Sequence, residues 1–83
     1  MNVTVRYFAS IREALGLGSE TLHTEASTLA QLRDELLARG GVHAEVLARD
    51  RAVRLALDQV LCDEARALHE GCEVAFFPPV TGG

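Results

Sequence analysis

The feature that most constrains the fold of this sequence is a leucine pattern near its middle. Four leucines recur at positions i, i+3, i+7 and i+8, the spacing of one face of an α-helix: Leu29, Leu32, Leu36 and Leu37. Thr28 and Gln31 have capping-box spacing at the start of this segment, and Gly40-Gly41 predicts its end. Arg33 lies off the stripe and is expected to point away from the core. Because an apolar stripe must be covered, the rest of the chain has to supply a surface for this helix.

The segments around the helix alternate with the two-residue period of β-strands. Residues 3–8 place Val3, Val5 and Tyr7 on one face and Phe8 on the other, where we expect it to face outward. Weaker or shorter strand patterns cover four more segments: residues 20–24, 53–57, 60–62 and 73–77. These strands can form the sheet that covers the leucine stripe.

The elements between the strands are shorter and less regular. Ser10 and Glu13 have capping-box spacing for a short helix, which is predicted to stop at Gly16 or Gly18. Residues 42–51 carry a mixed pattern that is compatible with a short second helix. The leucine-rich segment is therefore the main helix of the chain.

Turn residues complete the pattern. Asp58-Gln59 predicts a hairpin turn, residues 63–70 a charged loop and Gly71 a turn point. Pro78-Pro79 ends the last strand, because proline cannot donate to the ladder. The order strand, short helix, strand, long helix, hairpin and last strand predicts one α+β domain over residues 1–77. Its sheet is expected to be mixed, with four to five strands and one main helix packed across it.

Composition and charge exclude several classes of function. The formal net charge is −4, and the eight basic residues, all arginine, are dispersed along the chain. Binding to nucleic acid requires clustered Lys or Arg, so this partner is not expected. No segment approaches the ~20 apolar residues of a membrane span, and the N-terminal residues carry no signal-peptide pattern. We therefore expect a cytoplasmic protein with no membrane partner.

The reactive side chains of the domain have structural explanations. Cys62 and Cys72 lack the spacing of a zinc or redox pair and are expected to be small apolar core or strand residues. Asp63-Glu64 is expected in a solvated loop. The three histidines are scattered without ligand spacing and are expected at the solvated surface: His23, His43 and His69. No catalytic or metal-ligating residue is therefore assigned.

The C-terminal sequence Pro-Pro-Val-Thr-Gly-Gly is the candidate functional element. Pro78 and Pro79 favour an extended path, so residues 78–83 form a tail that can project at most about 20 Å. Gly82 and Gly83 lack a Cβ and fit a channel too narrow for other residues. The terminal carboxylate can be adenylated, and a sulfur nucleophile can convert that mixed anhydride to a thiocarboxylate. An end without function is the alternative.

Residues 73–83, Glu-Val-Ala-Phe-Phe-Pro-Pro-Val-Thr-Gly-Gly, join an apolar strand directly to this tail. They resemble the C-terminal signature of the small subunit of molybdopterin synthase. Residues 7–13 resemble the first strand and following helix of that family. Residues 57–61 resemble a family hairpin, with Asp58 where asparagine is common. The resemblance spans essentially the whole chain and implies a ubiquitin-like β-grasp fold.

The resemblance also implies that the domain carries sulfur while its partners do the chemistry. A ubiquitin-activating-type enzyme would use ATP to adenylate Gly83, which is then converted to a thiocarboxylate. The tail would insert into the large synthase subunit, where sulfur passes to cyclic pyranopterin monophosphate; its residues are Val80, Thr81, Gly82 and Gly83. The family's apolar docking surface corresponds to Phe8, Leu61 and Phe77. No cofactor is expected on this chain, and the catalytic residues are expected on the large subunit.

Three other functions are compatible with the same tail. The chain could be a protein modifier that forms isopeptide bonds through Gly83, although its lack of lysine argues against chains built on itself. It could carry sulfur to another acceptor, such as a thiazole or a thiolated tRNA base. It could also be an interaction module with an inert tail. The residues alone leave these alternatives open.

Overall fold

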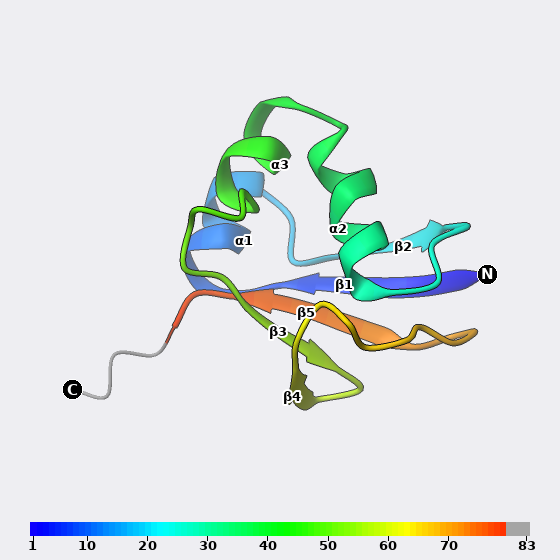
Figure 1. Ribbon diagram of the computed structural model, residues 1–83. Helices are drawn as coiled ribbons and strands as arrows, with labels where there is room; N and C mark the ends of the chain where they lie inside the picture. Colours follow the sequence, from blue (N-terminus) through cyan, green and yellow to red (C-terminus); the bar gives the residue numbers. More distant parts are fainter. Residues whose placement is uncertain (80–83) are drawn as a thin grey trace.

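The computed structural model describes residues 1–79 as five strands and three helices (Figure 1). In chain order they are β1 (Asn2–Tyr7), α1 (Ala9–Leu15), β2 (Ser19–His23), α2 (Leu29–Leu37), α3 (Gly41–Val46), β3 (Arg54–Leu57), β4 (Val60–Cys62) and β5 (Glu73–Phe77). The sheet order is β2-β1-β5-β3-β4, with β1 and β5 parallel and the other pairs antiparallel. The predicted mixed α+β sheet is confirmed. None of the three helices within residues 1–79 has the length and hydrophobicity that a membrane span requires.

The helices lie on one side of the sheet, and the core is between them and the strands (Figure 1). Strand β1 and helix α2 contribute side chains that are at most 1% exposed: Val3, Val5 and Tyr7 from the strand, and Leu29, Leu32 and Leu36 from the helix. Leu37 is half-buried against the same core. The predicted apolar faces of the strand and the helix are therefore confirmed, and their burial stabilises the fold by roughly 25 cal/mol per Å² of apolar surface.

Helix α2 begins as the sequence predicts but ends earlier. The Thr28 side chain accepts a hydrogen bond from the Gln31 backbone N–H at 3.3 Å, as expected for an N-cap. The helix ends at Leu37, before the predicted stop at Gly40-Gly41. Both glycines have positive φ, +70° and +55°, and make the turn into α3 instead. The segment of mixed pattern that follows contains α3 in its first part.

Helix α1 begins two residues before the predicted position. Its N-cap is Phe8, whose apolar side chain cannot cap, so the predicted cap by Ser10 is wrong. The reason is the backbone: Ala9 has φ +50°, which turns the chain out of β1 and into the helix before Ser10 is reached. The helix ends at Gly16 in the left-handed conformation, as predicted.

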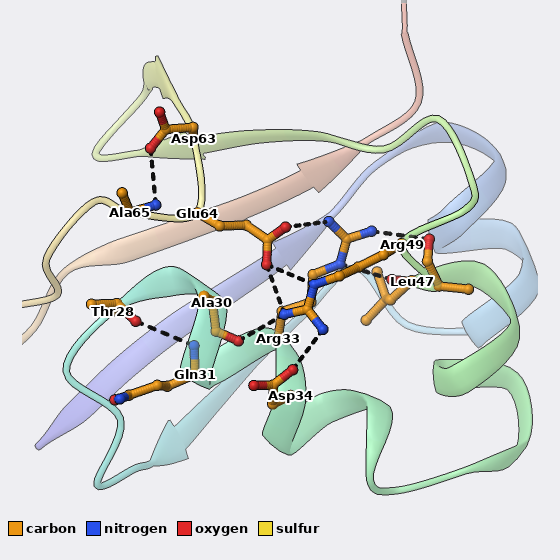
Figure 2. Close-up of polar contacts among 11 residues, drawn as sticks. Thr28, Ala30, Gln31, Arg33, Asp34, Leu47, Arg49, Asp63, Glu64 and Ala65 are labelled. Carbon is orange, nitrogen blue, oxygen red and sulfur yellow. Dashed lines mark hydrogen bonds and ion pairs between the residues drawn. The ribbon is translucent and has the colours of Figure 1, made fainter.

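Arg33 is buried, contrary to the prediction that it points away from the core; it is 4% exposed. Its guanidinium donates to the carbonyls of Leu47 (2.8 Å) and Ala48 (3.0 Å), which follow α3, and pairs with Glu64 at 3.6 Å (Figure 2). Burial lowers the pKa of Arg33, while Glu64 opposes that shift. The backbone carbonyls and the carboxylate thus satisfy a charge that would otherwise be costly to bury.

Glu64 is half-buried, so the prediction of a solvated Asp63-Glu64 loop is wrong for this residue. Besides Arg33, it accepts from Arg49 at 2.7 Å, and Arg49 also donates to Asp34 at 2.6 Å (Figure 2). This network joins α2, the segment after α3 and the loop before β5. It holds the three against one another at the edge of the core.

His43 is also more buried than predicted, with 20% of its side chain exposed. Its ring lies edge-on to Tyr7, with ring centroids 6.2 Å apart. The Tyr7 hydroxyl donates to Glu20 at 2.8 Å, and burial followed by this carboxylate raises the pKa of Tyr7. Burial alone would raise the pKa of Glu20, but hydrogen bonds from Arg39 and Tyr7 lower it overall. His23 and His69 are exposed, as predicted.

The hairpin and the last strand lie where the sequence places them. Asp58 and Gln59 have φ of +49° and +69°, which is the conformation of a two-residue hairpin turn. Cys62 is half-buried and packs against the core, and Cys72 is 0% exposed; both are free. Burial raises the pKa of the Cys62 thiol. The two cysteines are therefore small apolar packing residues, as predicted.

Candidate functional site

An open groove of about 640 Å³ lies on the face of the sheet opposite the core. Phe8, Leu61 and Phe77, the three residues predicted to dock a partner, all line it. Phe8 follows β1, Leu61 is the middle residue of β4 and Phe77 is the last of β5. The sheet brings them together although the chain separates them by up to 69 positions. Phe8 is 38% exposed and Leu61 64%. Large exposed apolar side chains gathered in this way are typical of an interface.

The two phenylalanines form one wall of the groove. Their ring centroids are 6.4 Å apart and the rings are perpendicular, a favourable edge-to-face pair. The Phe8 backbone N–H still donates to the Phe76 carbonyl at 3.2 Å, so Phe8 continues the pairing of β1 with β5. Ala9 then turns the chain away with its positive φ. Phe8 is thereby held beside Phe77 at the point where the strand ends.

The floor of the groove consists of two alanines. Ala56 and Ala75 are register partners on β3 and β5, and Leu61 on β4 pairs with Ala56. Each alanine sits between two core residues in its strand, so it points to the opposite face of the sheet. They are only 6% and 8% exposed because larger side chains stand around them. The groove is hollow because the side chains of its floor are small and those of its walls are large.

The rim of the groove is polar. Arg6 pairs with Glu73 at 3.4 Å, and its guanidinium carbon lies 5.4 Å from the centroid of the Phe8 ring. Beside Glu73, in the turn between β3 and β4, Asp58 accepts from the Glu73 backbone N–H at 2.9 Å and pairs with His69 at 2.7 Å. The backbone hydrogen bond, then His69, lowers the pKa of Asp58. The rim and the neighbouring hairpin turn are thus both attached to Glu73 at the start of β5.

The root of the tail lies at this groove. Pro78 and Pro79 follow β5 and line the groove beside Phe77. Pro78 also lines a second hollow of about 230 Å³, formed by α1, α3 and residues 51–53. The remaining predicted site residues, Val80, Thr81, Gly82 and Gly83, lie outside the described residues. Their assignment, and the division into a domain over 1–77 and a tail over 78–83, stay predictions.

The described lining of the groove is mostly apolar. Among the described residues that line it, the ionisable side chains are Arg6 and Glu73, and these pair with each other. Its lining includes no cysteine, histidine, lysine, serine or threonine from residues 1–79 that could act as nucleophile or base. The same residues contain no group of three or more His, Cys, Asp or Glu side chains placed to hold a metal ion.

Several residues of this surface were not predicted from the sequence. Ala56 and Ala75 build the floor, while Arg6, Gln59 and Glu73 build the rim. Alternation within residues 73–77 could have placed Ala75 on the same face as Phe77. The register between β3 and β5, which sets Ala56 beside Ala75, has no signal in the sequence.

Comparison with known proteins identifies a family and several similar proteins. Residues 5–83 match the model described as the ThiS family. The molybdopterin synthase sulfur carrier subunit of Haemophilus influenzae is 35% identical over 81 residues, which cover 98% of this chain and 99% of that protein. Subunit 1 in a solved complex of subunits 1 and 2 of the molybdopterin-converting factor from Helicobacter pylori is similar over the full length of both chains, with 28% identity and a TM-score of 0.72.

A third similarity concerns the fold alone. SAMP1 from Haloferax volcanii superposes with a TM-score of 0.80 over the full length of both chains, at 21% identity. Together with the five-stranded sheet crossed by helices, these likenesses confirm the predicted ubiquitin-like β-grasp fold.

Proposed function

This chain belongs to the ThiS family, and we propose that it is the sulfur carrier subunit of a molybdopterin synthase. The observation that carries the proposal is an apolar groove at the root of a tail that ends in Gly82-Gly83. A carrier needs a surface by which partners hold it and a slender end that reaches their active sites. The groove supplies the first and the tail sequence the second.

The proposed reaction takes place at the carboxylate of Gly83. An oxygen of that carboxylate attacks the α-phosphorus of ATP and releases pyrophosphate, which gives an acyl adenylate. A donor persulfide attacks the acyl carbon through its outer sulfur and displaces AMP, which gives an acyl disulfide with the donor. A second thiol then attacks the donor sulfur, forms a disulfide with it and releases the thiocarboxylate. Transfer of this sulfur to cyclic pyranopterin monophosphate, with water supplying the replacing oxygen, restores the carboxylate. Because a dithiolene contains two sulfur atoms, each product molecule consumes two loaded carriers.

The partners would share the chemistry. A ubiquitin-activating-type enzyme in the cytoplasm binds the ATP and adenylates Gly83, and the large synthase subunit accepts the tail, residues 80–83. Phe8, Leu61 and Phe77 provide the apolar contacts that hold the domain during transfer. This chain binds no cofactor of its own and contributes no catalytic side chain.

Mass spectrometry tests the proposal directly. The purified chain is incubated with its adenylating enzyme, ATP and a sulfur donor, and the intact mass is measured. We expect the increase that corresponds to replacement of one oxygen by one sulfur, confined to the C-terminal peptide. Adding the large subunit and cyclic pyranopterin monophosphate should return the mass to its original value. A terminus that stays unmodified under these conditions would overturn the proposal.

A substitution in the tail provides the matched control. Gly82→Phe adds a side chain beyond the last strand, so the domain should unfold at the same denaturant concentration as the wild type. Sulfur transfer to the acceptor should be abolished, because the tail must enter a narrow channel. Transfer at the normal rate would refute the steric explanation. Hydrolysis-resistant adducts of higher mass, detected by immunoblot, would instead identify the chain as a protein modifier.

A further inference from the structure

The groove has a property that Phe8, Leu61 and Phe77 do not explain: its centre is empty because its floor is alanine. Ala56 and Ala75 are register partners on β3 and β5, and their small side chains line the bottom of the groove between larger neighbours. A flat apolar surface would be matched by a flat partner surface. A hollow with aromatic walls is matched by a side chain that projects into it, as anchor residues do at interface centres.

The face of the sheet opposite the core, the open face, is less negative than the molecule as a whole. Its charged strand residues are Arg6, Glu73 and Arg54, and Asp58 in the adjacent hairpin turn balances the two arginines, so these four sum to zero, whereas the whole chain carries −4. Arg6 and Glu73 pair with each other. Arg54 is exposed, lies beside Phe77 in the register of β3 and β5, and forms no ion pair with any residue from 1 to 79. One guanidinium on the open face, beside the groove residue Phe77, therefore remains available to a partner.

We propose that the large synthase subunit places an apolar side chain over Ala56 and Ala75 and a carboxylate opposite Arg54. This inference rests on the proposed function, and it is supported by two features. The groove is continuous with the root of the tail at Pro78 and Pro79, so a partner that takes the tail lies over it. The one cation on this face that is not engaged within the described domain calls for an acidic counterpart.

The two parts of the proposal affect different rate constants. A charge at the rim of an interface acts mainly on association and is screened by salt, whereas packing at the centre acts mainly on dissociation. Binding kinetics of the full-length chain with the purified large subunit, measured by biolayer interferometry at low and high salt, can therefore test each part separately.

Arg54→Glu tests the carboxylate. At about 20 mM salt, association should be about tenfold slower than for the wild type, and the difference should nearly vanish at about 500 mM salt. The matched control is Arg66→Glu, which makes the same charge change on an exposed arginine whose backbone contacts the start of α2, away from the groove. Its association rate should stay within about twofold of the wild type. Equal slowing in both variants, or no slowing in either, would overturn this part.

Ala75→Leu tests the hollow. The added side chain occupies the space proposed for the partner, so dissociation should be at least about tenfold faster while association changes little. Ala56→Leu fills the same floor from β3 and serves as the second variant if the first loses stability, which thermal unfolding followed by circular dichroism will show. If a folded Ala75→Leu or Ala56→Leu variant dissociates from the large subunit at the wild-type rate, the proposed side chain in the hollow is ruled out.

These outcomes are distinct from failure of the proposed function. If the wild-type chain acquires sulfur and binds the large subunit, but the variants behave as the wild type does, only the present inference is wrong. If the wild-type chain neither acquires sulfur nor binds the large subunit, the proposed function is wrong, and this inference is overturned with it.

Discussion

Strand β5 presents two successive phenylalanines to two different environments. Phe76 is 0% exposed and stacks on Tyr7 beneath the helices, with ring centroids 6.2 Å apart. Phe77 is half-buried on the opposite face, where it meets Phe8 edge-on at the groove. The chemical identity of the side chain is the same, and the face of the sheet decides its role. One face closes the core, and the other leaves apolar surface for a partner.

The same contrast extends across the central strands. On the core side, Leu55, Leu57 and Val74 fill the space under the helices. On the open side, Ala56 and Ala75 leave space unfilled. A protein that needed only stability would gain by filling both faces, since apolar burial is favourable wherever it occurs. The small residues on the open side are therefore better explained by binding than by folding.

Truncating the two phenylalanines should separate these roles most strongly. Phe76→Ala leaves a cavity in the core and should lower the free energy of unfolding by about 3–5 kcal/mol. Phe77→Ala removes a half-buried ring and should cost about 1 kcal/mol or less, while it weakens binding to the large subunit. Urea unfolding at equilibrium measures both values. Similar losses for the two variants would show that the open face contributes to folding as much as the core face does.

The buried arginine offers a second contrast, between two members of one ion network. Arg33→Ala leaves the Leu47 and Ala48 carbonyls without their buried donor and leaves the half-buried Glu64 paired with Arg49 alone. We expect a loss of about 3 kcal/mol in the free energy of unfolding. Arg49→Ala removes a 42% exposed side chain from the same network and should cost less than about 1 kcal/mol. If high salt reduced both losses equally, Arg33 would be behaving as a surface charge.

The sequence predicts the parts of this fold that depend on local periodicity. The alternation in β1 and the leucine stripe of α2 gave the correct buried faces, because each pattern repeats with the geometry of its own element. The turn at Asp58-Gln59 and the left-handed cap at Gly16 were also predicted, since their residue types suit those backbone conformations. The outward position of Phe8 belongs to the same class of prediction.

Features that depend on distant partners were missed. Arg33 is buried because carbonyls 14 and 15 positions later happen to face it, and His43 is half-buried because the α2–α3 turn brings it to Tyr7. The groove floor depends on strand register, which no local pattern encodes. For the candidate site, Phe8, Leu61 and Phe77 came from a family resemblance, and the structure brings the three together.

Asp58, the aspartate in the hairpin turn where the family commonly has asparagine, lies next to the open face. The lowered pKa of Asp58 means that its contribution to stability is present above the ordinary aspartate pKa and is lost as the pH falls through the lower, folded-state value. Asp58→Asn keeps a residue that tolerates positive φ but cannot titrate, so its free energy of unfolding should decrease less than that of the wild type below about pH 4. Asp50→Asn, an exposed aspartate that forms no hydrogen bond within residues 1–79, should follow the wild-type curve. Coincident curves for all three proteins would contradict this assignment.

The smallest effect is expected where the chain passes from the open face to the helical side. Ala9 follows Phe8 with φ +50°, a conformation that costs an alanine roughly 1–2 kcal/mol and costs glycine little. Ala9→Gly removes that strain but adds freedom to the unfolded chain, so the net change should lie between zero and a gain of about 1 kcal/mol. Ala14→Gly, in the same helix with ordinary helical geometry, should instead lose about 0.5–1 kcal/mol. Thermal and urea unfolding can resolve this difference in sign. Destabilisation of both variants to the same degree would mean that the turn beside Phe8 is relaxed, and that the position of Phe8 at the groove is set by its packing against Phe77 and Arg6 alone.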